Sequence, residues 1–229
     1  MPTRRTVLLS ALTALASRNI ARADNRHVIF WFTTSEQDAI QNCPFSSDIY
    51  RIVSNDLPCH GHDVRDAEPP ELEGWRYRID RGEDLLGDFI KRCSSKLDDL
   101  GLKKVFCGGI SRGGFAALHL SSRDPRFAYV AALSPVTDLL ALTEFAGCKS
   151  DTHPLHKDAG ILAERSLFLS IQSQDDRVST KDAIDLVGKI VTGSRRADVT
   201  LCIDPGSEHQ VSNAARRAAV EWISSRRDI

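Results

Sequence analysis

Short apolar runs alternate with amphipathic stretches along most of the chain. Several runs have the length and composition of buried strands, and polar residues, glycine or proline bound them. These runs cover residues 28–33, 103–107, 127–133, 166–171 and 199–203. Apolar residues at helical spacing predict helices between and after them, at residues 45–55, 82–100, 114–122, 180–191 and 214–225. Residues 56–66 form either a loop or a loop preceded by a weak, short sixth strand.

This alternation predicts one α/β domain, with a mostly parallel sheet of about six strands and helices on both faces. The 229 residues suffice for one such domain, which we place at residues 24–229. The alternation breaks at residues 138–160, where an apolar start (DLLALTEF) predicts a short helix. Because this segment follows the carboxyl end of a strand, it would lie over the edge of the sheet where ligands bind. It would be either a small cap that shapes a substrate pocket or a surface helix that completes the packing.

The first 23 residues differ in composition from the rest. Arg4 and Arg5 precede a short run of small and apolar residues, and residues 21–23 (ARA) have the form of a cleavage site. We therefore expect a signal peptide at residues 1–23 and an exported protein, periplasmic or extracellular. The paired arginines resemble a twin-arginine signal. The alternative is an organellar transit peptide, or a protein that stays in the cytoplasm.

Charge and cysteine content narrow the function classes. Without residues 1–23 the chain has 26 basic and 31 acidic side chains, a net charge of about −5. No stripe of basic residues indicates a nucleic-acid partner, and no apolar run is long enough for a membrane span. Six cysteines would permit disulfides in an exported protein, but their spacing does not give a pairing. Cys107 and Cys202 lie on predicted central strands, where cysteine usually acts as a small buried hydrophobe.

The strongest chemical signal follows the strand at residues 103–107. Residues 109–113 (GISRG) fit the pattern G-x-S-x-G, and a helical stretch follows them. In a sharp strand-turn-helix elbow this pattern exposes a nucleophilic serine at the top of a sheet. Side chains two positions before and after Ser111 would clash there, so both positions need glycine. The alternative is a glycine-rich turn with a surface serine.

A serine hydroxyl needs a base to become a nucleophile, and the chain supplies candidates in the order acid, then histidine. Asp175 and Asp176 directly follow the predicted strand at residues 166–171. His209 follows the strand at residues 199–203 and precedes the last predicted helix. Because carboxyl ends of parallel strands meet at one edge, these side chains would lie beside Ser111. Either aspartate could be the acid.

These segments resemble the α/β-hydrolase superfamily, and within it the prolyl-oligopeptidase-like and dienelactone-hydrolase-like branch. Residues 109–114 (GISRGG) look like the G-x-S-x-G-G of that branch, and residues 175–178 (DDRV) look like its D-x-x-V. The resemblance implies a minimal form of this fold. It also implies that Asp175 is the acid, which leaves Asp176 as a solvated neighbour or a partner of Arg177.

The other histidines fit structural or solvated positions better than chemical ones. Residues 56–62 (DLPCHGH) resemble a D-x-P-G-H-G segment of α/β-hydrolases, in which the histidine is usually structural, with Cys59 in place of a glycine. No cluster of His, Cys or Asp at ligand spacing indicates a metal. The remaining four histidines lie at a strand start, within a helix and in the 138–160 segment, at positions 27, 119, 153 and 156. We expect no metal and no organic cofactor.

Together these features predict a serine hydrolase that cleaves a small carboxylic ester through an acyl-enzyme. Ser111 would attack, His209 would take its proton and Asp175 would orient the imidazole. One oxyanion donor would be the backbone amide of Arg112, the residue after the nucleophile. Relatives carry H-G where this chain has residues 32–35 (FTTS), so the second donor would be the amide of Thr34 or Ser35. The alternatives are a peptidase, an acyl transferase or a non-catalytic binding protein with this fold.

Overall fold

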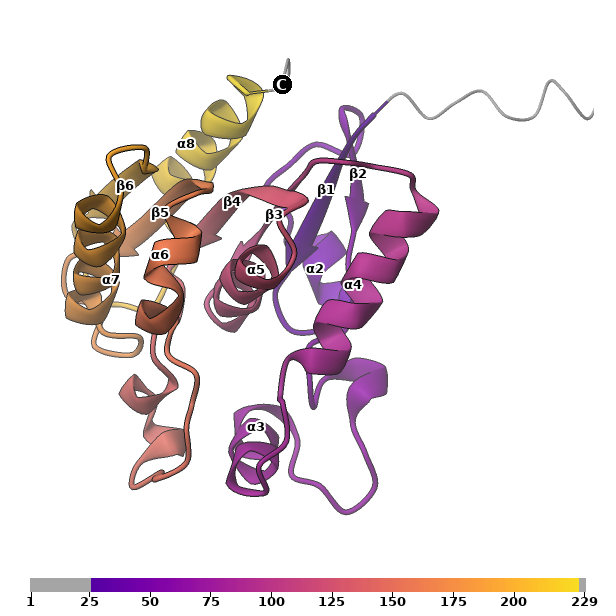
Figure 1. Cartoon of the computed structure of the whole chain (residues 1–229), viewed down its shortest axis with the longest axis vertical. Coiled ribbons are helices and arrows are strands. Elements are labelled where there is room, and N and C mark those ends of the chain that lie inside the picture. Colours follow the sequence, from indigo (N-terminus) through magenta and orange to yellow (C-terminus); the bar gives the residue numbers. More distant parts are fainter. Residues whose placement is uncertain (1–25, 227–229) are drawn as a thin grey trace, which may run out of the picture.

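The computed structural model describes residues 26–226. A sheet of six strands in the order β2-β1-β3-β4-β5-β6 forms its centre, and every neighbouring pair is parallel. The strands are β1 (His27–Phe32), β2 (Tyr50–Val53), β3 (Val105–Ile110), β4 (Phe127–Leu133), β5 (Ser166–Gln172) and β6 (Asp198–Asp204). The helices are α2 (Glu36–Gln41), α3 (Glu71–Asp80), α4 (Gly87–Asp99), α5 (Arg112–Arg123), α6 (Ala159–Leu162), α7 (Thr180–Gly193) and α8 (Asn213–Ser224) (Figure 1).

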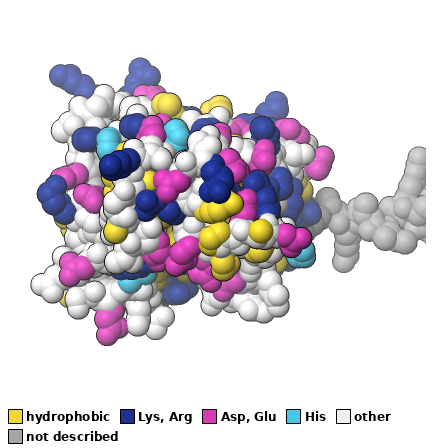
Figure 2. All heavy atoms as spheres, turned by 90° about the horizontal axis from the view of Figure 1, so that it is seen from below, with side chains coloured by type: hydrophobic (Ala, Val, Ile, Leu, Met, Phe, Trp, Pro, Cys, Tyr) yellow, Lys and Arg dark blue, Asp and Glu magenta, His cyan; other side chains and the backbone are white. Residues whose placement is uncertain are grey.

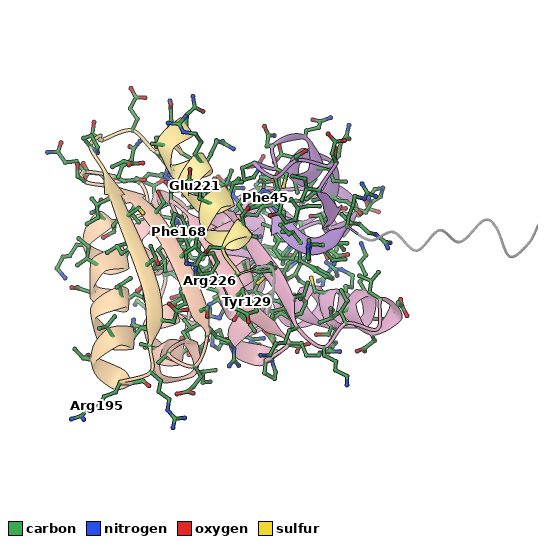
Figure 3. The ribbon with its side chains drawn as sticks, turned by 90° about the horizontal axis from the view of Figure 1, so that it is seen from above. Phe45, Tyr129, Phe168, Arg195, Glu221 and Arg226 are labelled. Atoms are coloured by element: carbon green, nitrogen blue, oxygen red, sulfur yellow. The ribbon has the colours of Figure 1, made fainter. Side chains whose placement is uncertain are left out.

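Helices cover both faces of the sheet, as the sequence predicts. On one face α4, α5 and α7 pack on the inward side chains of the strands, and Leu97, Phe115 and Leu186 are buried there. On the other face α2 and α8 cover a smaller core. Figure 3 shows α8 lying over Phe168 and Tyr129, and every apolar side chain removed from water contributes to this two-sided packing.

Most predicted elements are confirmed, with ends that differ by a few residues. The helix predicted at residues 45–55 is wrong. Residues 50–53 of this segment form the edge strand β2, paired with β1, and the helix of the region is α2, which lies earlier in the chain. Tyr50 is buried and its ring lies 5.6 Å from that of Phe45. Aromatic and β-branched residues suit a strand, and over so short a run the apolar spacing of residues 49–53 (IYRIV) fits a helix as well as a strand.

Helix α3 has no counterpart among the predicted elements. It follows Pro69 and Pro70. Because its sequence ELEGWRYRID is mostly polar, the apolar residues show no clear helical spacing. The helix contains Arg78, whose side chain is 4% exposed. This guanidinium donates to Asp63 Oδ2 at 2.6 Å and to Glu68 Oε2 at 2.8 Å. The pairing fixes the loop between β2 and α3, because a buried charge is stable only when it is paired.

The segment at residues 138–160 forms short 3₁₀ turns and the brief helix α6 rather than one apolar helix. Its turns are η2 (Leu139–Ala141), η3 (Thr143–Phe145) and η4 (Leu155–Asp158). The segment and α3 both project toward the bottom of Figure 1. The Arg76 side chain on α3 donates to the carbonyl oxygens of Glu144 and Ala146. This contact joins the segments that follow β2 and β4, and whether they form a cap remains a prediction.

Other predictions concern the termini and the cysteines. The predicted signal peptide, residues 1–23, lies outside the described residues. Within residues 26–226 no helix has the length and apolar character to cross a membrane. All six cysteines have free thiols, and Cys107 is buried on β3 as predicted, whereas Cys202 on β6 is partly exposed.

Candidate active site

Ser111 occupies a strained turn between β3 and α5. Its backbone has φ +55° and ψ −118°, a conformation that a residue with a side chain rarely adopts. The turn is held because the Ser111 amide donates to the Leu133 carbonyl at 2.9 Å. The Ser111 carbonyl accepts from the amides of Phe115 and Val136. The predicted elbow is therefore present, and its strain is stabilised by β4 and α5.

The two glycines of the elbow pattern sit against the end of β1. A Cβ atom on Gly113 would lie 2.1 Å from the carbonyl oxygen of Phe32 and 2.9 Å from the nitrogen of Thr33. A Cβ on Gly109 would lie 2.4 Å from the same Phe32 oxygen. These obstacles are backbone atoms, which cannot rotate away. Both positions therefore require glycine, as the sequence predicts.

Gly113→Ala is expected to lower the free energy of unfolding by about 1–3 kcal/mol, because the added methyl group must push β1 away from α5. The measurement is urea unfolding followed by circular dichroism. Gly188→Ala is the matched control, since a Cβ at that position in α7 meets nothing within 4 Å. Alanine there should stabilise the protein by about 0.5–1 kcal/mol. Equal midpoints for the two variants would contradict the packing argument.

His209 joins Ser111 to an acid. Its Nε2 lies 2.9 Å from Ser111 Oγ, and its Nδ1 lies 2.8 Å from Asp175 Oδ2. The three side chains come from the loops after β3, β5 and β6, so parallel strands bring residues 111, 175 and 209 to one edge of the sheet. The histidine is partly exposed while the aspartate is 1% exposed. This arrangement can move a proton from a serine hydroxyl to an imidazole.

Asp175 rather than Asp176 contacts the histidine. Asp175 Oδ1 accepts the amides of Arg177 at 3.0 Å and Val178 at 3.3 Å, which leaves Oδ2 for His209. Asp176 is exposed. A partner role for Asp176 toward Arg177 is wrong, because that guanidinium forms a bidentate pair with Glu144 at 2.8 and 2.6 Å.

The Arg177–Glu144 pair links the acid loop to η3. The hydrogen bonds from Arg177 lower the pKa of Glu144 to about 2, although burial alone would raise it. The ion pair therefore stays charged at neutral and mildly acidic pH. It attaches the segment after β4 to the residues that flank Asp175.

The loop after β1 directs its hydrogen bonds to Asp38. The hydroxyl of Thr34 donates to Asp38 Oδ2 at 2.9 Å, and Ser35 Oγ caps α2 by accepting the Asp38 amide. Burial would raise the pKa of Asp38, but hydrogen bonds, including those from the side chain and amide of Thr34, lower it. Thr33, which sequence reasoning passed over, borders the elbow through Gly113. The second oxyanion donor stays a prediction, with Thr34, Ser35 and now Thr33 as its candidates.

The remaining histidines lie apart from this group. His60 is buried, and its Nε2 contacts the Arg112 guanidinium at 2.7 Å. His62 is exposed and pairs with Asp56, while His119 is buried in α5, 3.2 Å from Asp158. His27, His153 and His156 are exposed. Among residues 26–226 no group of three or more His, Cys, Asp or Glu side chains could hold a metal ion.

Comparison with known proteins identifies the fold. No protein-family model and no curated protein matches the sequence. A solved structure from Thermus thermophilus superposes with a TM-score of 0.71 at 15% identity, over 87% of this chain and 88% of that one. A cold-adapted esterase from an Arctic intertidal metagenomic library gives 0.61 at 16% identity, over 90% and 85%.

A putative dipeptidyl aminopeptidase IV from Bacteroides ovatus is a further structural neighbour. It gives a TM-score of 0.57 at 17% identity and matches 90% of this chain but 32% of its own. The chain therefore spans about a third of the length of this neighbour. The sheet and these likenesses show that the chain has the α/β-hydrolase fold.

Proposed function

We propose that the protein is a serine hydrolase that cleaves a carboxylic ester through a covalent acyl-enzyme. The observation that carries the proposal is the unbroken contact from Ser111 Oγ through both nitrogens of His209 to Asp175 Oδ2. A fold alone supports many chemistries, whereas a serine, a base and an orienting acid at hydrogen-bond distances fit acyl transfer. The α/β-hydrolase fold supports the same conclusion, and so does the position of the three side chains at the carboxyl ends of the strands.

In the proposed reaction His209 accepts the Ser111 proton as the oxygen attacks the ester carbonyl. The tetrahedral oxyanion lies against the backbone amide of Arg112, which has no hydrogen-bond partner among the described residues. The imidazolium, stabilised by Asp175, then gives its proton to the leaving alkoxide. Water then attacks the acyl-enzyme while His209 takes a proton from that water. His209 returns the proton to Ser111 Oγ, and the carboxylic acid is released. None of these steps requires a cofactor.

An ester is the substrate class that the neighbours favour, since one of them is named as an esterase. Peptide cleavage is the alternative supported by the aminopeptidase neighbour, but the chain spans only 32% of that protein. A non-catalytic binding protein would have no need of a strained serine in contact with a paired histidine. Hydrolysis of 4-nitrophenyl butyrate, compared with an aminoacyl 4-nitroanilide, distinguishes these classes.

The test is covalent labelling by a fluorophosphonate probe together with ester hydrolysis. The native protein should label at Ser111 and release 4-nitrophenol, and Ser111→Ala should do neither while keeping its melting temperature. Ser207→Ala is the matched control, because Ser207 is exposed in the loop that leads to His209. Labelling that persists in Ser111→Ala, or a native protein that neither labels nor hydrolyses esters, would overturn the proposal.

A further inference from the structure

The side chain of Arg112 is built into the rim beside the reactive serine. Arg112 directly follows Ser111 and opens α5, so its guanidinium lies on the same edge of the sheet. Its side chain is only 18% exposed. Nη1 contacts His60 Nε2 at 2.7 Å and Glu71 Oε2 at 3.2 Å. Arg112 is therefore held in one place, unlike a solvated arginine at a helix start.

His60 is held as a neutral acceptor for this arginine. An arginine donates only, so Nε2 of His60 must be unprotonated, and Nδ1–H then donates to the Pro58 carbonyl at 2.7 Å. The same carbonyl accepts Trp75 Nε1 at 2.6 Å, and the two rings meet edge to face. Burial lowers the pKa of His60, and the charge of Arg112 lowers it further. The histidine orients the guanidinium without neutralising it.

Glu71 is the one acidic partner of Arg112 among the described residues, and it is loosely held. Its side chain is 62% exposed and takes only one of the arginine N–H groups. The Nε and Nη2 groups of Arg112 form no hydrogen bond within residues 26–226. Arg177, two positions after Asp175, by contrast donates from both terminal nitrogens to Glu144. Figure 2, which views the molecule from below, shows acidic and basic side chains intermixed on that face.

We propose that Arg112 binds a carboxylate on the substrate, so that the preferred substrates are esters with an anionic group a few bonds from the scissile carbonyl. This inference rests on the proposed hydrolase function and narrows its substrate class. A guanidinium with an open edge matches the two oxygens of a carboxylate. Glu71 competes with the substrate carboxylate for Arg112. Removing the Glu71 charge should therefore strengthen the preference for anionic esters, whereas removing Arg112 should weaken it.

The test compares a neutral ester, 4-nitrophenyl butyrate, with an anionic one, the 4-nitrophenyl monoester of glutaric acid. The measured quantity is the ratio of kcat/KM for the anionic ester to kcat/KM for the neutral ester. Arg112→Gln keeps the backbone amide and should lower this ratio about 10–100-fold. Arg112→Lys keeps the positive charge but lacks the planar guanidinium, so its ratio should lie between those of the native protein and Arg112→Gln. Glu71→Gln should raise the ratio about threefold.

Arg123→Gln is the matched control, because Arg123 ends the same helix and pairs with Asp84 at the surface. Its ratio should equal that of the native protein. An Arg112→Gln variant that slows both esters by the same factor would overturn the inference and leave the hydrolase intact. A ratio that falls in Glu71→Gln would also overturn it. A native protein that hydrolyses neither ester would instead count against the proposed function.

Discussion

Asp175→Asn is expected to lower kcat for 4-nitrophenyl butyrate about 10³–10⁴-fold, because it reverses the hydrogen bond that sets the imidazole tautomer. Two backbone amides, those of Arg177 and Val178, point at Oδ1 of residue 175. An asparagine would keep its oxygen there and present its NH₂ group to His209 Nδ1. The imidazole proton would then sit on Nε2, facing Ser111, where it blocks acceptance of the serine proton.

Asp176→Asn is the control for this experiment, since the neighbouring carboxylate is exposed and His209 pairs with Asp175 and Ser111 instead. Its kcat should stay within about twofold of the native value, as for most surface changes. Melting temperatures of both variants separate a loss of chemistry from a loss of fold. If Asp176→Asn were inactive and Asp175→Asn active, the assignment of the acid would be wrong.

The sequence predicted the inner strands of the sheet, β1, β3, β4 and β5, well because most of their residues are buried. A continuous apolar run such as residues 127–133 has few alternatives. The edge strand β2 is different: only four residues long, it has neighbours on one side alone. Ile49, just before the strand, and Ile52 and Val53 within it fit helical spacing as well as a strand. Pairing with β1, a contact far along the chain, decides the outcome.

The contacts of His209 with Ser111 and Asp175 were predictable from residue order, since in this fold an acid and then a histidine follow the serine. The surroundings of Ser111 were not. Arg112 meets His60, 52 positions earlier, and Glu71 on a helix that sequence patterns did not indicate. The loop after β1 was also unpredictable, because its hydrogen bonds depend on Asp38, a residue with no distinctive sequence context. Contacts between irregular segments leave no periodic signal.

Arg78→Ala is expected to cost about 3–5 kcal/mol of unfolding free energy, because it removes the cation from a buried ion network. The guanidinium donates to Asp63, Glu68 and the Asp63 carbonyl, and the hydrogen bonds to both acids raise its pKa against the effect of burial. Without it two mostly buried carboxylates would lose their one buried counterion, and only the more exposed Arg92 and Arg65 would still pair with Asp63 and Glu68. Urea unfolding in low added salt measures the loss, because urea is uncharged and does not screen the ion network.

Arg65→Ala is the matched control, since Arg65 shares Glu68 with Arg78 but its side chain is 49% exposed. Exposed pairs contribute little, so this variant should lose less than about 1 kcal/mol. Similar losses in both variants would show that burial of Arg78 does not matter. The two variants also test the surroundings of Arg112, because the loop that Arg78 fixes contains His60 and leads into Glu71. If that loop positions Arg112, Arg78→Ala should weaken the preference for the anionic ester while the protein is still folded.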